Sequence, residues 1–490
     1  MGEVSLQLRQ KLHTYVQTFA QHDEECYKQL IPNCDAEAFL AQQIPLLDCP
    51  DPLIEQIYYF RWWTYRKQIR QTASGHVITE FLPPVPWAGP ENTIVCPAGF
   101  HIREGRWLKD PQHWLEEYIR FWLDGHGDTH AYSTWLPHAV WEYCSVKDDA
   151  SLGLALLPQM IGFFRTRERR HLRSCGLYWS CDDRDGMEYS ISGSGFRPTL
   201  NAYACADAQA IARFLRLRGD TEGAADFERR ADMLRCAMQR LLWDGTFYKT
   251  LPAAEQEDPH WDTRPAVPAR HDVRELVGYV PWYFDLPQAD QAAAFAPLMD
   301  ETCFFSPFGL TTAEQSHPRF LERFDHECLW NGYIWPFATS QTLVACANAL
   351  RSEKAAGLRK EDYYTLLRQY AHAQHLRLAD GTVIPWIDEN MNPKTGRWES
   401  RAILQEQGWQ PALGGYERGK DYNHSLFCDL VLSGLLGLQV ENGSWRADPL
   451  IPESWDYFKV ENLWLHGACY TVTYDKTGEH YHGSRGLTIR

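Results

Sequence analysis

The residues best suited to chemistry form a short segment around Glu389. The segment reads Asp388-Glu389-Asn390-Met391-Asn392-Pro393-Lys394-Thr395-Gly396. Asn-Pro followed by Thr-Gly cannot continue a helix, because proline lacks an amide proton and restricts its neighbour, whereas glycine permits positive φ. We therefore expect Glu389 in a loop, where catalytic residues concentrate. Turn chemistry alone also fits, and by itself favours, a surface turn with a solvated glutamate.

A second acidic segment lies before the middle of the chain. It reads Trp179-Ser180-Cys181-Asp182-Asp183-Arg184-Asp185-Gly186-Met187-Glu188-Tyr189-Ser190. Its four carboxylates within seven residues repel one another, which raises the pKa of the least solvated one, as a general acid requires. Two other interpretations stay open: a solvated acidic loop, and a calcium site, although Asp-x-x-Asp-Gly-x-Glu lacks the full ligand spacing. An acid here could face the Glu389 carboxylate across a cleft, which is the arrangement that glycoside hydrolysis needs.

Aromatic side chains are unusually frequent, and they point to the same chemistry. The chain has 20 Trp and 24 Tyr, and 13% of its residues are aromatic. Many of the tryptophans stand beside Asp, Glu, Asn, Arg or Gly. A ring next to hydrogen-bonding groups suits a sugar, whose C–H faces stack on aromatics while its hydroxyls need fixed partners. For any single tryptophan, a place in a large core explains it equally well.

These segments need a scaffold, and helical periodicity dominates the remaining sequence. Apolar residues recur at helical spacing in residues 4–19, 52–70, 112–123, 131–143, 151–165, 200–217, 220–242, 289–299, 334–351, 360–377 and 422–436. Asp220 is expected to cap the helix that follows it. The intervening loops carry Trp, Gly and acidic residues, as in an α/α toroid with a cleft at one end. Residues 74–82 and 455–489 alternate like strands, so the prediction is a mainly α fold with small β additions there.

Composition and charge exclude several function classes. A net charge of −16 and a pI near 5.6 argue against nucleic acid and anionic membranes as partners. The 14 cysteines are scattered without Cys-x-x-Cys or zinc spacing, which is typical of reduced thiols in a cytoplasmic protein. The N-terminus lacks the apolar core of a signal peptide, although a chain whose signal had been removed would look the same. No phosphate loop occurs, so no cofactor and no metal are predicted, and the oligomeric state stays open.

Three motifs resemble those of the six-hairpin (α/α)6 glycoside hydrolases, in the group containing mannosylglycerate hydrolase, glucosidase I type α-glucosidases and trehalase. Gly186-Met187-Glu188-Tyr189-Ser190 is similar to Gly-(Met/Leu/Trp)-Asp-x-Ser, whose carboxylate is the general acid. The segment from Glu389 to Gly396 is similar to Glu-x-x-(Asn/Asp)-Pro-x-Thr-Gly, whose glutamate is the general base. Residues 330–336 are similar to the Trp-Arg-Gly-Pro-(Ile/Val)-Trp loop that lines the sugar site. The resemblance covers roughly residues 90–440 and implies an (α/α)6 barrel there, preceded by N-terminal helices with a short β segment (1–89) and followed by a β appendage (441–490).

The motifs also depart from the family pattern. The acid would be Glu188 where the family has Asp, with Asp185 as the alternative. Asn331 replaces the arginine of the tryptophan loop, and Tyr333 replaces its proline. Recognition of an acidic substrate group by that arginine is therefore not implied for this chain, so glycerate-linked sugars are not assumed.

The resemblance implies an inverting mechanism on a glycoside or small oligosaccharide, expected to be α-linked. Protonated Glu188 would protonate the leaving oxygen while Glu389 activates water on the opposite face, with carboxyl groups ~6.5–9.5 Å apart. The predicted stacking platforms are Trp179, Trp330, Trp335 and Trp386, with Asn331 and Asp185 holding hydroxyls. Two further segments supply candidate substrate-binding residues, for which interhelix ion pairs and helix caps are an equal alternative: His101, Glu104, Arg106, Tyr422 and His424.

Two other classes of function remain as alternatives. Sugar epimerases also use (α/α)6 barrels, but they work with histidines at the pocket floor and would not need the Glu389 turn. A non-catalytic carbohydrate-binding protein would keep its affinity and show no change in activity when Glu389 is replaced. Phosphorolysis is disfavoured, because Glu389 would repel phosphate.

Overall fold

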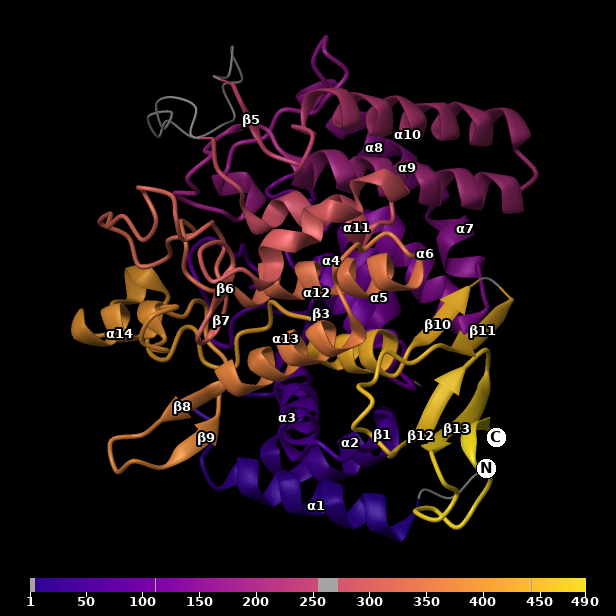
Figure 1. The fold of residues 1–490 in the computed structure, drawn as a ribbon, viewed down its shortest axis with the longest axis vertical. Coiled ribbons are helices and arrows are strands. Elements are labelled where there is room, and N and C mark those ends of the chain that lie inside the picture. Colours follow the sequence, from indigo (N-terminus) through magenta and orange to yellow (C-terminus); the bar gives the residue numbers. More distant parts are fainter. Residues whose placement is uncertain (1–4, 111, 254–271, 442) are drawn as a thin grey trace.

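The computed structural model describes residues 5–110, 112–253, 272–441 and 443–490, and helices dominate it (Figure 1). The α-helices are α1 (Leu6–Ala20), α2 (Ala36–Gln43), α3 (Pro52–Gln68), α4 (Ala98–Gly105), α5 (Trp114–Leu123), α6 (Leu136–Lys147), α7 (Ser151–Ala155), α8 (Leu157–His171), α9 (Pro198–Leu217), α10 (Thr221–Leu241), α11 (Val280–Tyr283), α12 (Pro336–Arg351), α13 (Lys360–Ala373), α14 (Glu399–Glu406) and α15 (Phe427–Asp429). The prediction of a mainly α toroid of helical hairpins is confirmed.

Helix ends follow local sequence rules. Asp220 caps α10 as predicted, because its carboxylate accepts the backbone N–H of Gly223 at 2.9 Å. Asp51 does the same for α3, with Pro52 at the first helical position. Residues 289–299 form a 3₁₀ helix rather than the predicted α-helix, and Pro297 lies inside it.

The predicted helix 422–436 is the clearest departure. Residues 422–426 are not helical; α15 begins at Phe427 and continues as a π-helix over Leu430–Leu435. The Leu426 amide donates to the Ser340 hydroxyl at 3.1 Å, so this part of the chain bonds to α12 instead of to its own helix. Tyr422 and His424 therefore lie on an irregular segment, where side chains can turn toward a cavity.

The strands are short and are mostly arranged in two-stranded pairs. They are β1 (Leu46–Asp48), β2 (Ile69–Thr72), β3 (Gly75–Ile78), β4 (Gly195–Phe196), β5 (Leu251–Pro252), β6 (Phe305–Ser306), β7 (Gly309–Leu310), β8 (His375–Arg377), β9 (Val383–Pro385), β10 (Leu438–Glu441), β11 (Ser444–Ala447), β12 (Tyr457–Leu465), β13 (Ala468–Asp475) and β14 (Gly486–Ile489). The β2–β3 hairpin and the C-terminal sheet confirm the two predicted β additions.

One connection joins distant parts of the chain. The C-terminal sheet has the order β1-β12-β13-β14, and Leu46 pairs with Glu461. In Figure 1 the yellow C-terminal strands accordingly lie beside the indigo N-terminal helices. The division at residues 89 and 440 stays a prediction, since the N-terminal segment shares this sheet with the C-terminal one.

Many of the aromatic side chains lie in the hydrophobic core. Trp62, Trp63, Trp107, Trp135 and Trp282 are each less than 2% exposed. Helix α3 is buried on all sides from Ile57 to Gln68, as expected of a helix surrounded by others. The core explanation therefore holds for many tryptophans, and only those beside a cavity remain candidates for sugar binding.

Candidate active site

Backbone hydrogen bonds join the three motif segments. The Trp330 amide donates to the Glu188 carbonyl at 3.2 Å. Ile334 and Met391 exchange two backbone bonds, of 2.9 and 3.0 Å, as an isolated antiparallel bridge. The tryptophan loop, residues 330–335, is thus bonded to the Glu188 segment at Trp330 and to the Glu389 segment at Ile334. Helix α12 begins directly after this loop, at Pro336. Such backbone contacts fix the relative positions of the two acidic loops.

Both predicted catalytic carboxylates line one cavity of about 180 Å³. Its walls are Glu80, Phe81, Trp87, Ile94, Cys96, Tyr132, Gly186, Glu188, His326, Glu327, Cys328, Trp330, Trp335, Glu389, Arg418, Tyr422 and His424. Aromatic rings alternate here with carboxyl, imidazole and guanidinium groups. The volume lies below the ~300–1,000 Å³ typical of drug-sized ligand sites, so it suits a small unit such as one sugar ring.

Glu389 is paired with a buried guanidinium at the cavity wall. Its side chain is buried, and its Oε2 accepts from Arg418 Nε at 3.1 Å and also from Nη2. Burial alone would lower the pKa of Arg418, but Glu389 and its neighbours raise it well above its usual range. The Cys328 thiol lies 3.5 Å from Glu389 Oε1. A carboxylate with a permanent cation on one oxygen is suited to accepting a proton through the other.

Glu188 is half-buried at the same wall and contacts the aromatic side of the cavity. The Trp330 indole N–H donates to Glu188 Oε2 at 2.8 Å. The Trp330 ring stacks on Trp335 at 4.4 Å between centroids, and Trp335 stacks on Phe337 at 4.7 Å. The general acid candidate therefore stands at the edge of a column of rings, where a sugar face can stack while its glycosidic oxygen meets the carboxyl group.

Asp185 does not share this wall. Its carboxylate accepts from Arg197 Nε at 2.8 Å and from the Thr199 hydroxyl, and both members of the ion pair have fully buried side chains. The next residue, Gly186, has φ of 71° and lines the cavity with its backbone. The turn thus directs Asp185 into the protein and Glu188 toward the cavity, which favours Glu188 as the acid.

Four of the predicted substrate-binding residues line the cavity: Trp330, Trp335, Tyr422 and His424. The Tyr422 hydroxyl is hydrogen-bonded to His424 Nδ1, while His424 Nε2 is buried without a hydrogen-bond partner. Burial lowers the pKa of His424 well below its usual range, so the imidazole is neutral. A neutral ring with one unsatisfied nitrogen can exchange a hydrogen bond with a sugar hydroxyl.

The other predicted stacking and hydroxyl-binding residues lie outside the wall. The Trp179 indole donates to the Ala253 carbonyl at 2.9 Å. The Asn331 amide donates to a backbone carbonyl at 2.7 Å and so holds its own loop. The Trp386 ring is covered by the guanidinium of Arg401 at 4.6 Å from the ring centroid. These contacts stabilise the loops around the cavity instead of presenting a surface to a sugar.

His101 and Glu104 have structural partners. His101 Nδ1 accepts from the Tyr118 hydroxyl at 2.9 Å and Nε2 donates to the Asn423 carbonyl at 2.8 Å, and burial lowers its pKa to about 4. The Glu104 carboxylate accepts the backbone amides of Cys428 and Asp429, at 3.0 and 2.8 Å. Glu104 thus caps the N-terminus of α15, the alternative that the sequence had left open.

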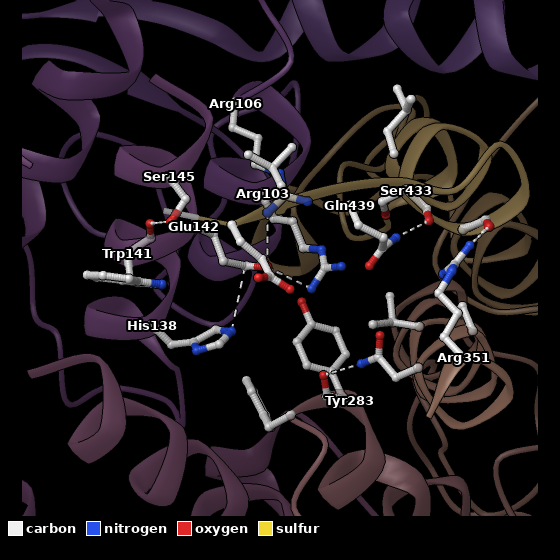
Figure 2. A pocket seen from close by; sticks show the side chains of 18 of the residues that line it. Arg103, Arg106, His138, Trp141, Glu142, Ser145, Tyr283, Arg351, Ser433 and Gln439 are labelled. Carbon is white, nitrogen blue, oxygen red and sulfur yellow. Dashed lines mark hydrogen bonds and ion pairs between the residues drawn. The ribbon is translucent and has the colours of Figure 1, made fainter. Parts of the chain in front are cut away.

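Arg106 lines a second cavity, of about 530 Å³, shown in Figure 2. It contacts Glu142 at 3.0 Å and Asp429 at 2.9 Å, and Arg103 contacts the same two carboxylates. This cavity is lined by the second half of α12, whereas Trp335 precedes the first turn of that helix. The two cavities therefore lie toward opposite ends of α12, and Arg106 is separate from the carboxylate pair.

Sequence reasoning missed several residues of the catalytic cavity, of which Glu80 and Arg418 are the most important. Glu80 follows the β2–β3 hairpin, and Arg418 follows α14, so both are far in sequence from the motifs they meet. No spacing rule connects them to Glu389. The only available signal was the presence of charged residues in turn-rich segments, which is typical of surface loops as well.

Comparison with known proteins identifies the family. The domain family described as "Mannosylglycerate hydrolase MGH1-like glycoside hydrolase domain" matches residues 90–425. The chain belongs to this glycoside hydrolase family. Membership confirms the resemblance to the six-hairpin glycosidases and the prediction of a glycosidase. It also disfavours the epimerase and the non-catalytic binding protein.

Solved structures extend the comparison. A protein described as a sialidase shares 34% identity with a TM-score of 0.88, over 98% of this chain and 43% of that chain. This chain thus spans less than half the length of that relative. The Streptomyces avermitilis α-L-rhamnosidase complexed with L-rhamnose shares 11% identity with a TM-score of 0.54, over 88% of this chain and 36% of that chain. A GH78 rhamnosidase of Bacillus sp. GL1 shares 14% identity with a TM-score of 0.52, over 88% of this chain and 40% of that chain. At these identities, both rhamnosidases support the fold alone.

Within the ranges that the structure describes, no helix is long and apolar enough to cross a membrane. Among those same residues, no group of three or more His, Cys, Asp or Glu side chains is arranged to hold a metal ion. The Asp182 carboxylate instead accepts from the Ser194 hydroxyl at 3.1 Å.

Proposed function

We propose that this chain hydrolyses glycosidic bonds with inversion, with Glu188 as the general acid and Glu389 as the general base. The observation that carries the proposal is the presence of both carboxylates on one small cavity beside the stacked rings of Trp330 and Trp335. Family membership supplies the reaction class, and the cavity supplies candidates for each role.

The steps follow from the two carboxyl groups. Glu188 donates its proton to the glycosidic oxygen as the bond to the anomeric carbon breaks. Glu389 takes a proton from a water molecule, whose oxygen bonds to the anomeric carbon from the opposite face. The products are the free sugar with inverted configuration and the alcohol, and solvent returns the proton from Glu389 to Glu188. Inversion requires carboxyl groups ~6.5–9.5 Å apart to leave room for that water, which a crystal structure with a bound sugar would measure.

The cavity favours an uncharged sugar unit. Its wall carries four carboxyl groups and one guanidinium, and that guanidinium already pairs with Glu389 and Glu327. An anionic sugar would meet carboxylates without an available cation. The size of the cavity supports removal of a terminal sugar ring from a glycoside or small oligosaccharide, and the α-linkage follows from the family resemblance.

The test is a panel of neutral aryl and natural glycosides, with NMR of the first-formed anomer. We expect hydrolysis of at least one α-glycoside with inverted product. Glu389→Gln should lower kcat by ~10²-fold or more while substrate binding persists, because only the proton acceptor is lost. Glu399→Gln is the matched control, since Glu399 is equally buried and pairs with Arg397 at 3.0 Å but does not line the cavity.

Three outcomes would contradict the proposal. Retained anomeric configuration in the first product would exclude the inverting mechanism. Isomerisation of a free monosaccharide without hydrolysis of any glycoside would favour the epimerase alternative. Equal activity of wild type and Glu389→Gln would show that Glu389 is not the general base.

A further inference from the structure

Glu80 is a further carboxyl group on the wall of the cavity that Glu188 and Glu389 share. It lies after β3, before the family-matched residues 90–425 begin, and its side chain is buried, with 5% of the residue exposed. Asn423 fixes the backbone of this segment: its amide donates to the Glu80 carbonyl at 3.0 Å, and its Nδ2 donates to the Thr79 carbonyl at 3.2 Å. The carboxyl group is thus held in place by backbone contacts to the segment that carries Tyr422 and His424.

Among the residues that the structure describes, no Lys or Arg forms an ion pair with Glu80; burial raises its pKa by more than a hydrogen bond with the Tyr422 side chain and the charge of Arg418 lower it. Its Oε1 lies 3.6 Å from Nδ1 of His424, which is neutral, and the only guanidinium on the wall is engaged by two other carboxylates. The titratable and charged groups around it are Cys96, Tyr118, Tyr132, Glu188, Glu327, Cys328, Glu389, Arg418, Tyr422 and His424. Burial, followed by the negative charges of Glu389 and Glu188, raises the pKa of Glu80 well above its usual range.

The raised pKa favours the un-ionised form of the Glu80 carboxyl group, which lines the cavity. An un-ionised carboxyl group has one O–H donor and one carbonyl acceptor, which together match a sugar hydroxyl. Leaving such a buried group without a partner is costly, so a ligand that lacks the matching hydroxyl binds less well. Glu80 differs from the acid and the base in its contacts, because the Trp330 indole donates to Glu188 and Arg418 donates to Glu389, whereas Glu80 meets the Tyr422 side chain and the neutral imidazole of His424.

We propose that Glu80 is a specificity-determining residue that donates a hydrogen bond to one hydroxyl of the sugar held between Glu188 and Glu389. The inference rests on the proposed function and deepens it. According to this inference, a residue that precedes the family-matched residues 90–425 helps to select the sugar. The stacked rings then bind the sugar face without distinguishing closely related sugars, and Glu80 reads a particular hydroxyl position.

The test compares Glu80→Gln and Glu80→Ala with wild type on the best substrate of the panel. Gln has the same shape as the un-ionised acid and keeps a donor and an acceptor, so kcat/KM should stay within ~3-fold of wild type. Ala removes both, and kcat/KM should fall ~10–100-fold, mainly through KM. Glu104→Gln is the matched control, since Glu104 is also buried and its pKa is raised, to about 7, but it lies outside the cavity. Melting temperatures of all variants show whether a loss reflects unfolding.

Monodeoxy substrates identify the hydroxyl. Wild type should hydrolyse one deoxy analogue ~10-fold or more slowly than the parent substrate. Glu80→Ala should hydrolyse that analogue and the parent at similar rates, while it still discriminates against analogues that lack other hydroxyls. Equal damage from Gln and Ala would overturn the inference, because it would mean that an ionised carboxylate is needed. The inference would also be overturned if folded Glu80→Ala still hydrolysed that deoxy analogue as slowly, relative to the parent substrate, as wild type does. If wild type hydrolyses no glycoside, the proposed function fails first, whereas normal turnover in Glu80→Ala refutes this inference alone.

Discussion

Replacing Arg418 with Met tests whether one guanidinium organises the base side of the cavity. Arg418 is 1% exposed and donates from Nε and Nη2 to Glu389, and from Nη1 to Glu327 at 2.6 Å. Met fills a similar volume without charge. Breaking a buried ion pair by removing one partner costs ~3–5 kcal/mol, because the remaining charge stays buried. We expect the free energy of unfolding to fall by about 3 kcal/mol or more at neutral pH, since two carboxylates lose one cation.

The pH dependence of that loss has a definite sign. Burial alone would raise the pKa of Glu327, but Arg418 holds it below its usual value of 4.5. A depressed carboxyl pKa contributes stability that is present above the unfolded value and is lost as the pH falls through the folded value. The difference in unfolding free energy between wild type and Arg418→Met should therefore be full near neutrality and shrink below about pH 4.5. Urea unfolding of both proteins across this range measures it.

Activity gives the second readout. Without the guanidinium, the ionised form of the base loses its counter-ion, so the acidic limb of the kcat/KM profile should move ~1–3 units higher in pH. Arg167→Met is the matched control, because Arg167 pairs with Asp207 at 2.6 Å in an equally buried site away from the cavity. Arg167→Met should lose a similar amount of stability, but the acidic limb of its kcat/KM profile should stay at the same pH as in wild type. An unmoved limb in Arg418→Met as well would refute the assignment of Arg418 to the base.

Three further predictions concern single side chains. Glu188→Gln should lower kcat/KM ~10²-fold for alkyl glycosides but far less for dinitrophenyl glycosides, whose leaving group needs no proton; equal losses would contradict the acid role. Trp330→Phe keeps the stack on Trp335 but removes the donor to Glu188, so the basic limb of the pH profile should move to higher pH, and an unchanged limb would exclude that contact. Burial raises the pKa of Glu104 from 4.5 to about 7, so wild type should lose stability between these values as the pH rises, and Glu104→Gln should not; parallel melting profiles would contradict this.

Local sequence patterns predicted the parts of the site that depend on local structure. The Asn392-Pro393 pair and Gly396 are conformational signals, and the structure has a loop there, with φ of 69° at Gly396. Helical periodicity likewise predicted most helices to within a few residues, and Asp220 was identified as a cap from its side chain alone. The choice between Glu188 and Asp185 needed coordinates, because it depends on Arg197, which the acidic motif does not contain.

Aromatic content was the weaker guide. A tryptophan beside a charged residue in sequence has the same pattern whether its ring packs under an arginine, as Trp386 does under Arg401, or faces a cavity, as Trp330 does. Burial of many tryptophans in one chain requires partners for many indole N–H groups, and nearby polar residues supply some of them. The polar surroundings that suggested sugar binding are therefore also what a tryptophan-rich core needs.

The composition of the cavity argues that the active site depends on the whole chain. The acid, the base and the tryptophan loop lie within the family-matched residues 90–425, but Glu80, Phe81 and Trp87 precede them and form part of the same wall. The segment that carries Glu80 is attached through Asn423 to the loop after α14, and the helices before it are tied by β1 to the C-terminal sheet. A change in the N-terminal segment can therefore alter sugar selection without touching the two reacting carboxylates. The two proposals together assign the chemistry and the choice of sugar to different parts of the sequence, which is one way in which a single barrel can serve many glycosides.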